Sequence, residues 1–420
     1  MREVALNKEA RMHRLQNQRR ITYSLIERAR TLLAPGKPFS RELHELFRSQ
    51  GKFGSKDRRL YRELIYTYLR YLPWLDPIYK DQSAFMNALI CLAAPTEEVS
   101  SLYPTLPDKR PPELPEGKRH KVLKREDHQL MELLPDWFAN HCKRHVSIRS
   151  LLPLISRPPL WLRIQRDPEE TVLDQLRKAP PNAEIAQQIA PHPEVPNCLH
   201  APADFKLTEL PVYLNGMVEI QDISSQILLN LIPSPVRGNW LDACAGAGGK
   251  TLQLAKLLKP YGKVDAYEPR ASAVRELSAR VKRSELSNIT LLDRRPSSGQ
   301  YDGVLVDAPC SGSGTWRRHP YLMRQTRERD VFDYAEKQFT ILKSYAPLVK
   351  TGGLLVYCTC SLSRFENEAV TERFLKASSE YEHQPLPSQF GLQDHGLGIT
   401  VYPEDFNGDG LYVACLKRVR

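Results

Sequence analysis

The chain has 420 residues, 41% of them hydrophobic, so it is long enough to bury a sizeable core and to form two or three domains. No stretch approaches the roughly 18–20 continuous apolar residues of a membrane span, and the first twenty residues lack the apolar core of a secretory signal, which predicts a cytoplasmic protein without a membrane partner. The formal net charge is +11, and eight cysteines spread over so long a chain exclude a disulfide-stapled scaffold.

The first predicted region, residues 1–92, is all-helical. Apolar residues recur at helical spacing in 43–47 and 60–69, and the glycine-containing turn 51–54 separates the two helices. The excess positive charge is concentrated here, because residues 1–80 hold 18 Lys and Arg against 8 Asp and Glu. A focused positive field attracts polyanions, so nucleic acid is the expected partner. A solubilising helix face or a contact with an anionic membrane would give the same charge count.

A proline-rich segment, residues 100–121, follows. Its prolines stand among charged residues, which disfavours regular structure and predicts a linker or an exposed loop. We assign residues 1–150 to the helical domain, with this linker inside it. A strand at 160–164 and a helix near 171–178 are then predicted to open a small α/β extension over 151–232.

From residue 233 to residue 420 the pattern changes to short apolar strands that alternate with amphipathic helices. The predicted strands are 240–243, 264–267, 289–292, 303–306 and 353–357. The predicted helices begin at Thr251 and Ala271, and a third covers 334–348. This alternation predicts a doubly wound α/β domain with a mainly parallel sheet.

The first of these strands leads into a glycine-rich turn and then a helix. The turn is formed by Cys244, Ala245, Gly246, Ala247, Gly248, Gly249 and Lys250. Its glycines allow a tight turn, Gly248 is expected where the backbone approaches a ligand, and the helix N-terminus offers unpaired N–H groups. The next two strands end at Glu268 and Asp293, where carboxylates can bind the ribose and the adenine of an adenosine-bearing ligand. A carboxylate in either position could instead only cap the following helix.

Two later strands end in thiols. One ends at Asp307 and is followed by Cys310; the other ends at Cys358 and Cys360. Neighbouring parallel strands meet at the same edge of a sheet, so these groups are expected to converge. Methylation of cytosine at carbon 5 is one reaction that needs such an arrangement. A thiolate that adds to carbon 6 activates carbon 5 for methylation, and a base must later remove the carbon 5 proton.

Metal binding and burial are the competing explanations for these cysteines. Cys358 and Cys360 could be half of a thiolate metal site, but no second pair with zinc spacing completes it, and His141 with His145 stands alone. We therefore expect no metal. Inert core positions are expected for the remaining cysteines, Cys91, Cys142, Cys198 and Cys415.

Three ordered motifs, residues 242–251, 307–312 and 359–361, resemble the signatures of the NOL/NOP/Sun family of RNA cytosine-5 methyltransferases. The resemblance covers residues 158–420. The N-terminal part is similar to the helical NusB-like domain of the bacterial Sun-type enzymes that modify small-subunit ribosomal RNA. It implies a Rossmann-like methyltransferase domain preceded by a small α/β RNA-binding extension and an all-helical N-terminal domain.

The family resemblance also implies the roles of single residues. Cys360 is the nucleophile, Cys310 assists product release, and Asp307 contacts the cytosine. We also place Lys250 among the catalytic residues. S-adenosylmethionine is held by residues 244–250, Glu268, Asp293 and Asp307; Ala247 departs from the family, which usually has proline there.

The resemblance favours 16S ribosomal RNA as the substrate of a monomeric enzyme. A transfer-RNA cytosine-5 methyltransferase and a non-catalytic, RNA-binding ribosome assembly factor are the alternatives. A non-catalytic assembly factor would be expected to lack at least one of the residues that carry the chemistry, and none of them is missing. A DNA cytosine methyltransferase would use Cys310, the cysteine of its Pro-Cys pair, as nucleophile.

Overall fold

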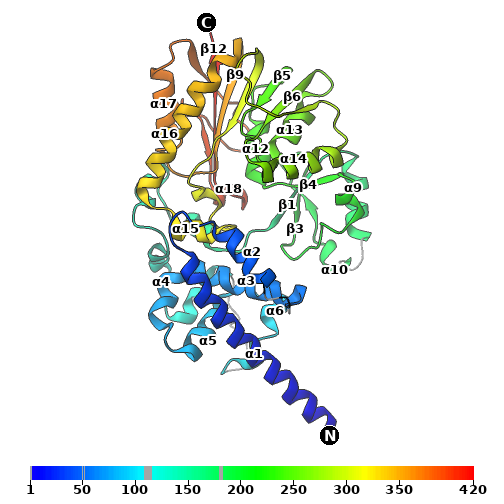
Figure 1. Ribbon diagram of the computed structural model, residues 1–420, viewed down its shortest axis with the longest axis vertical. Helices are drawn as coiled ribbons and strands as arrows, with labels where there is room; N and C mark the ends of the chain where they lie inside the picture. Colours follow the sequence, from blue (N-terminus) through cyan, green and yellow to red (C-terminus); the bar gives the residue numbers. More distant parts are fainter. Residues whose placement is uncertain (1, 50, 52, 108–115, 179–182) are drawn as a thin grey trace. The chain divides into compact units, whose positions relative to one another are not determined.

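The computed structural model describes residues 2–49, 51, 53–107, 116–178 and 183–420. Part of the predicted proline-rich linker, residues 108–115, therefore lies outside the described residues. The chain divides into two compact units (Figure 1). Unit 1 contains residues 1–139, 146–157 and 316–326, and unit 2 contains residues 140–145, 158–315 and 327–420.

Unit 1 is helical. Its α-helices are α1 (Arg2–Leu32), α2 (Phe39–Ser49), α3 (Ser55–Arg70), α4 (Leu72–Leu75), α5 (Gln82–Leu92), α6 (Glu97–Ser100), α8 (Ile148–Ile155) and α15 (Pro320–Gln325). Its 3-10 turns are Asp76–Ile78, Tyr103–Thr105, Glu116–Leu123 and Asp127–Leu133, so short helical turns flank the undescribed part of the linker. The helix α7 (Phe138–His141) spans the boundary between the units in the sequence.

Burial explains the helices of unit 1. Apolar residues of α3 at helical spacing, such as Leu60, Leu64 and Tyr68, are fully buried. The segment that contains α15 comes from the C-terminal half of the chain, yet Arg324 donates hydrogen bonds to the carbonyl oxygens of Leu69 and Arg70 at the end of α3. These bonds satisfy backbone acceptors that a helix end leaves free.

Unit 2 begins with a small antiparallel sheet. Its strands are β1 (Leu160–Ile164), β2 (Ala190–Pro191), β3 (Cys198–Ala201) and β4 (Val218–Ile220), in the order β2-β3-β1-β4. The helices α9 (Glu169–Lys178), α10 (Ala183–Ala186) and α11 (Pro211–Leu214) accompany it. The predicted strand at 160–164 and the helix near 171–178 are thereby confirmed.

A large mixed sheet forms the rest of unit 2. Its strands are β5 (Gly238–Asp242), β6 (Gly262–Tyr267), β7 (Ile289–Leu292), β8 (Tyr301–Asp307), β9 (Val349–Thr359), β10 (Tyr381–Gln384), β11 (Ile399–Val401) and β12 (Leu411–Arg418). The order is β10-β12-β9-β8-β5-β6-β7, with β11 also paired to β12. Strands β5 to β9 are parallel, whereas β12 runs antiparallel to β9, β10 and β11. This is the predicted doubly wound, Rossmann-like fold, with an antiparallel edge that the sequence had not indicated.

Helices cover both faces of this sheet. They are α12 (Ile223–Asn230), α13 (Gly249–Leu258), α14 (Ala271–Ser284), α16 (Glu328–Tyr345), α17 (Glu368–Lys376) and α18 (Pro403–Phe406), with 3-10 turns at Ser313–Thr315 and Ala346–Leu348. α16 begins six residues before the predicted 334. In β8, Leu305 packs in the cluster with α12 and α13, whereas Val304 and Val306 pack with α16 and α17. No helix in the described part of the chain is both long and apolar enough to cross a bilayer.

Candidate active site

The glycine-rich turn connects β5 to α13. Gly248 has φ +90° and lies directly before the helix, and a Cβ there would overlap Cδ1 of Leu277 on α14. A side chain at this position would therefore meet helix α14, and the expected approach of the Gly248 backbone to a ligand stays a prediction. Gly246 and Gly249 are more open, because the nearest atoms to a Cβ there are Nη2 of Arg270 and Nη2 of Arg280, each at 3.9 Å.

Glu268 lies directly after β6 and its side chain is only 3% exposed. Its Oε2 accepts the backbone N–H of Gly246 at 2.9 Å, which ties the turn to the second strand. Its Oε1 accepts both the backbone N–H and Nε of Arg270, the N-cap residue of α14. Burial alone would raise the pKa of Glu268, but the hydrogen bonds from Arg270 and Gly246 together lower it. The carboxylate therefore stays ionised.

Two further carboxylates flank the turn. Asp293 follows β7 and is exposed. Asp242 ends β5, is buried, and accepts a 2.7 Å hydrogen bond from the Thr251 hydroxyl. Burial raises the pKa of Asp242 to about 7. Sequence reasoning gave Asp242 no role of its own, because nothing in the pattern distinguishes a buried strand-end carboxylate from an exposed one.

Lys250 and Asp307 meet across the end of the sheet. Lys250 Nζ lies 2.8 Å from Asp307 Oδ2, and the two side chains are 12% and 30% exposed. Burial alone would lower the pKa of Lys250, but the charge of Asp307 outweighs it and the pKa is raised. The ammonium group therefore remains charged.

The two predicted thiols lie side by side. Cys310 follows β8 and Cys360 follows β9, and their Sγ atoms are 3.1 Å apart. Both residues are half-buried. The hydrogen bond to Cys360, and after it burial, raises the pKa of Cys310 well above its ordinary value. Cys310 therefore stays a neutral thiol, and either sulfur can donate the hydrogen bond between the two residues.

A buried carboxylate, Glu366, connects the two cysteine loops. Its Oε1 accepts the backbone N–H of Ser311 at 2.8 Å, and its Oε2 accepts the hydroxyls of Ser311 and Ser361 at 2.5 and 2.6 Å. Gln338 Nε2 also donates to Oε1. Ser311 and Ser361 directly follow the two cysteines, so one carboxylate determines how the loops face each other. Sequence reasoning gave Glu366 no role, because nothing in the local pattern indicates that this carboxylate is buried.

The other cysteines are not part of this group. Cys358 is fully buried in the same hydrophobic cluster that Cys360 borders, and burial raises its pKa well above the ordinary value. Cys198 and Cys415 are also buried, and burial raises the pKa of Cys142 to about 12. All eight cysteines lie within the described residues and none forms a disulfide.

His141 contacts two side chains of unit 2. Its Nε2 lies 3.0 Å from Glu328 Oε1 and its Nδ1 lies 3.2 Å from the Ser363 hydroxyl. Within the described ranges, no group of three or more His, Cys, Asp or Glu side chains is arranged to hold a metal ion.

Comparison with known sequences identifies relatives along most of the chain. Residues 228–417 match the family model described as 16S rRNA methyltransferase RsmB/F. The ribosomal RNA small subunit methyltransferase B of Yersinia pestis bv. Antiqua (strain Angola) is 29% identical over 426 residues, which cover 91% of this chain and 95% of the relative. The protein of the same name from Pasteurella multocida (strain Pm70) is 29% identical over 318 residues, 72% of this chain and 69% of the relative.

Solved structures share the fold. The crystal structure of PH0851 has a TM-score of 0.72 and 22% identity, and the match covers 96% of this chain and 98% of that chain. NSun6 from Pyrococcus horikoshii, solved with SFG, has a TM-score of 0.56 and 16% identity over 65% of this chain and 94% of that chain.

Proposed function

We propose that this chain, which belongs to the RsmB/F family of S-adenosylmethionine-dependent RNA cytosine-5 methyltransferases, methylates a cytosine of 16S ribosomal RNA through a covalent bond between Cys360 and the base. The 3.1 Å contact between the thiols of Cys310 and Cys360 is the observation that carries this mechanism. One thiol is available to attack and the second is available to assist release.

The residues around the glycine-rich turn fit S-adenosylmethionine. The backbone is open at Gly246, and the Glu268 carboxylate is ionised. The Arg270 side chain that occupies this carboxylate is 70% exposed, so a ribose diol can replace it without moving the buried backbone. We assign the cofactor to residues 244–250, Glu268, Asp293 and Asp307. When bound, S-adenosylmethionine supplies an electrophilic methyl group.

The protein's part in the first step is to provide a thiolate at Cys360. The S–H of Cys310 and the nearby ammonium of Lys250 both stabilise negative charge on that sulfur. The thiolate adds to carbon 6 of the cytosine, which makes carbon 5 nucleophilic. Asp307, held by Lys250 at 2.8 Å, is assigned to contact the base.

Product release restores the aromatic ring. A general base from solvent accepts the proton of carbon 5, the electron pair of that carbon–hydrogen bond restores the double bond between carbons 5 and 6, and the bond between Cys360 and carbon 6 breaks so that the sulfur leaves as a thiolate. Cys310 is assigned to this step because its sulfur lies next to the leaving sulfur.

The basic residues of α1 to α3 support an RNA partner, because positive charge binds the phosphate backbone. We retain three regions, 1–150, 151–232 and 233–420, as a helical RNA-binding domain, an RNA-binding extension and the catalytic domain. The names of the relatives favour 16S ribosomal RNA over transfer RNA.

The test incubates full-length protein with labelled S-adenosylmethionine and unmodified 16S ribosomal RNA or transfer RNA, and then maps the methylated cytosines. Transfer is expected only to 16S ribosomal RNA. Cys360→Ala should abolish both transfer and covalent attachment, whereas Cys310→Ala should trap the protein–RNA adduct on denaturing gels. An adduct lost in Cys310→Ala and kept in Cys360→Ala would reverse the two roles. Transfer to transfer RNA alone would overturn the substrate, and no transfer despite cofactor binding would favour an assembly factor.

A further inference from the structure

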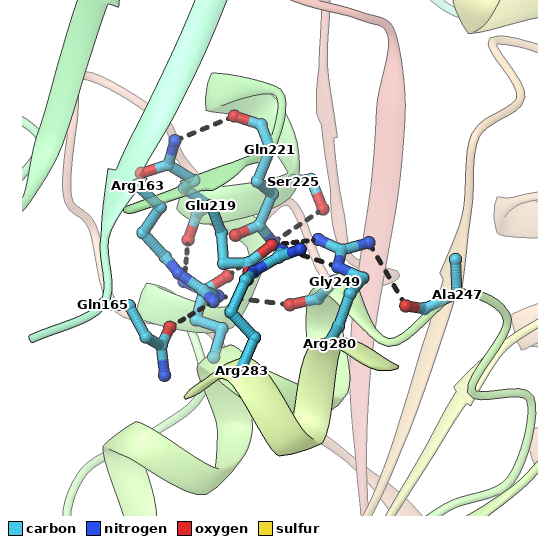
Figure 2. Close-up of polar contacts among 11 residues, drawn as sticks. Arg163, Gln165, Glu219, Gln221, Ser225, Ala247, Gly249, Arg280 and Arg283 are labelled. Carbon is cyan, nitrogen blue, oxygen red and sulfur yellow. Dashed lines mark hydrogen bonds and ion pairs between the residues drawn. The ribbon is translucent and has the colours of Figure 1, made fainter. Parts of the chain in front are cut away.

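The small antiparallel sheet carries a buried charge cluster that reaches the glycine-rich turn. Glu219 lies in the middle of β4 and is completely buried. It accepts hydrogen bonds from two arginines of α14: Arg280 Nε lies 3.0 Å from Oε2, and Arg283 Nη2 lies 2.6 Å from Oε1 (Figure 2). A buried carboxylate needs such partners, because an unpaired one would be strongly destabilising.

Arg280 also contacts the turn itself. Its Nη1 donates to the carbonyl oxygen of Ala247 at 3.2 Å, as Figure 2 shows. Arg280 therefore bridges the strand β4 and the turn with one planar guanidinium group. A guanidinium can do this because its donors have fixed directions.

The neighbouring strand contributes a second bridge. Arg163 on β1 is paired in register with Glu219 on β4, is 3% exposed, and donates to the carbonyl oxygen of Gly249 at 3.1 Å. The two carbonyls held in this way stand on either side of Gly248, the residue with φ +90°. Because both carbonyl oxygens accept hydrogen bonds from these arginines, the small sheet and its partner helix help to fix the conformation of the turn.

Close packing makes this connection stiff. A Cβ at Gly216, in the turn before β4, would overlap the backbone carbonyl of Arg283. Arg283 also stacks on Tyr213 at 4.2 Å, and Lys256 of α13 donates to the carbonyl oxygen of Ile164 at 2.8 Å. The small sheet, α13 and α14 are therefore closely packed around the turn.

We propose that Glu219, Arg280 and Arg163 position the glycine-rich turn for S-adenosylmethionine, so that the small antiparallel sheet is a structural part of the cofactor site. This inference rests on the proposed function of the turn. None of the three side chains is a catalytic residue; each acts through the backbone of residues 247–249.

The experiment compares two arginines of α14 in the full-length protein. Arg280 and Arg283 both bind Glu219 and are 14% and 17% exposed, but of the two it is Arg280 that donates a hydrogen bond to the turn. Arg280→Ala should weaken S-adenosylmethionine binding in calorimetry by about tenfold or more, as expected for losing a charged hydrogen bond. Arg283→Ala should weaken S-adenosylmethionine binding by less than about threefold, although it should lower the free energy of unfolding about as much as Arg280→Ala does. Arg275→Ala, an exposed arginine on the same helix, is the control.

Kinetics separates positioning from general damage. Arg280→Ala should raise KM for S-adenosylmethionine and leave kcat at saturating cofactor within about twofold, with the affinity for RNA unchanged. If Arg280→Ala does not fold, Arg280→Lys and Arg283→Lys carry the same comparison. Equal effects of the two arginines, or normal cofactor binding in Arg280→Ala, would overturn the inference. A wild-type protein that does not bind S-adenosylmethionine would instead overturn the proposed function.

Discussion

Single residues decide how the two thiols face each other. Cys310 and Cys360 come from different loops, and each loop continues with a serine that binds the same carboxylate, Glu366. Burial raises the pKa of Glu366, while its hydrogen bonds with Ser311, Ser361 and Gln338 oppose that shift. Without the carboxylate, the buried backbone N–H of Ser311 would lose its acceptor, which costs roughly 1–3 kcal/mol by itself.

Replacement of Glu366 should separate the cysteine loops. Glu366→Ala is expected to lower the free energy of unfolding by about 3 kcal/mol, because several buried donors lose their acceptor. Diamide should then form the Cys310–Cys360 disulfide more slowly than in the wild type, as measured by peptide mapping. Glu366→Gln keeps one oxygen acceptor, so its stability and its rate of disulfide formation should lie between those of the wild type and Glu366→Ala. Glu372→Ala on the exposed side of α17 is the control, and equal disulfide rates in all variants would contradict the role.

Asp242 should make stability depend on pH. Its pKa in the folded protein is about 7, above that of an unfolded aspartate, so the folded state holds the proton over a range in which the unfolded state has lost it. The contribution of Asp242 to stability is therefore complete below about pH 4 and is lost as the pH rises through about 7. Asp242→Asn cannot titrate. The Tm of the wild type relative to Asp242→Asn should be higher at pH 5 than at pH 7.5, and a constant difference would contradict this assignment.

At the scale of elements, the site is where three strand ends and one helix start meet. The parallel pairing of β8 with β9 brings Asp307 beside Cys358 in register, so the following loops start at the same edge. β5 lies next to β8, and the first turn of α13 directs Lys250 to Asp307. The glycine-rich turn can make this connection only because Gly248 adopts a left-handed conformation against Leu277.

Gly248→Ala should be more harmful than an alanine at a comparable exposed glycine. A positive φ alone costs a non-glycine residue about 1–2 kcal/mol, and the overlap with Leu277 should add about 1–3 kcal/mol. Gly352 has φ +83° with nothing within 4 Å of its Cβ position, so Gly352→Ala reports the backbone cost alone. Urea unfolding of both variants should show the larger loss at Gly248. Equal losses would mean that α14 yields to the added methyl group.

At the scale of the whole molecule, neither compact unit is one continuous stretch of chain. The segment 316–326 begins shortly after Cys310 and packs in unit 1, where Gln325 donates to the carbonyl oxygen of Ala34 at 3.0 Å. Deletion of residues 1–92 would therefore remove the core against which this segment is buried. Charge neutralisation is the cleaner way to test the RNA-binding role of unit 1.

Exposed arginines of α1 should contribute to the salt dependence of RNA binding. Arg11, Arg14 and Arg28 are exposed, and their joint replacement by alanine should reduce the slope of log K against log salt by about 2 if each contacts one phosphate. Filter binding from low to moderate salt measures the slope. The control replaces Lys337, Arg373 and Lys376 in α16 and α17 by alanine. It removes the same net charge and should leave the salt slope unchanged. An unaltered slope in the α1 variant would mean that RNA contacts another surface.

The sequence alone determined the order of elements and the chemical groups at the strand ends. The strands 160–164 and 289–292 were predicted to the residue, since apolar patterns and turn residues are local properties of the chain. The glycine-rich turn, Glu268 and the two cysteine motifs could be identified for the same reason. Their family resemblance supplied the roles that geometry had left open.

Only the tertiary structure decided which of these groups touch and which side chains support them. Cys310 and Cys360 are fifty residues apart, and their contact depends on the pairing of β8 with β9. The burial of Glu219 and Glu366 could not be read from the chain, because a carboxylate has the same local pattern on a surface as in a core. The antiparallel β12 likewise takes its register from β9, a non-local partner. Local preference determines an element, whereas long-range packing determines its neighbours.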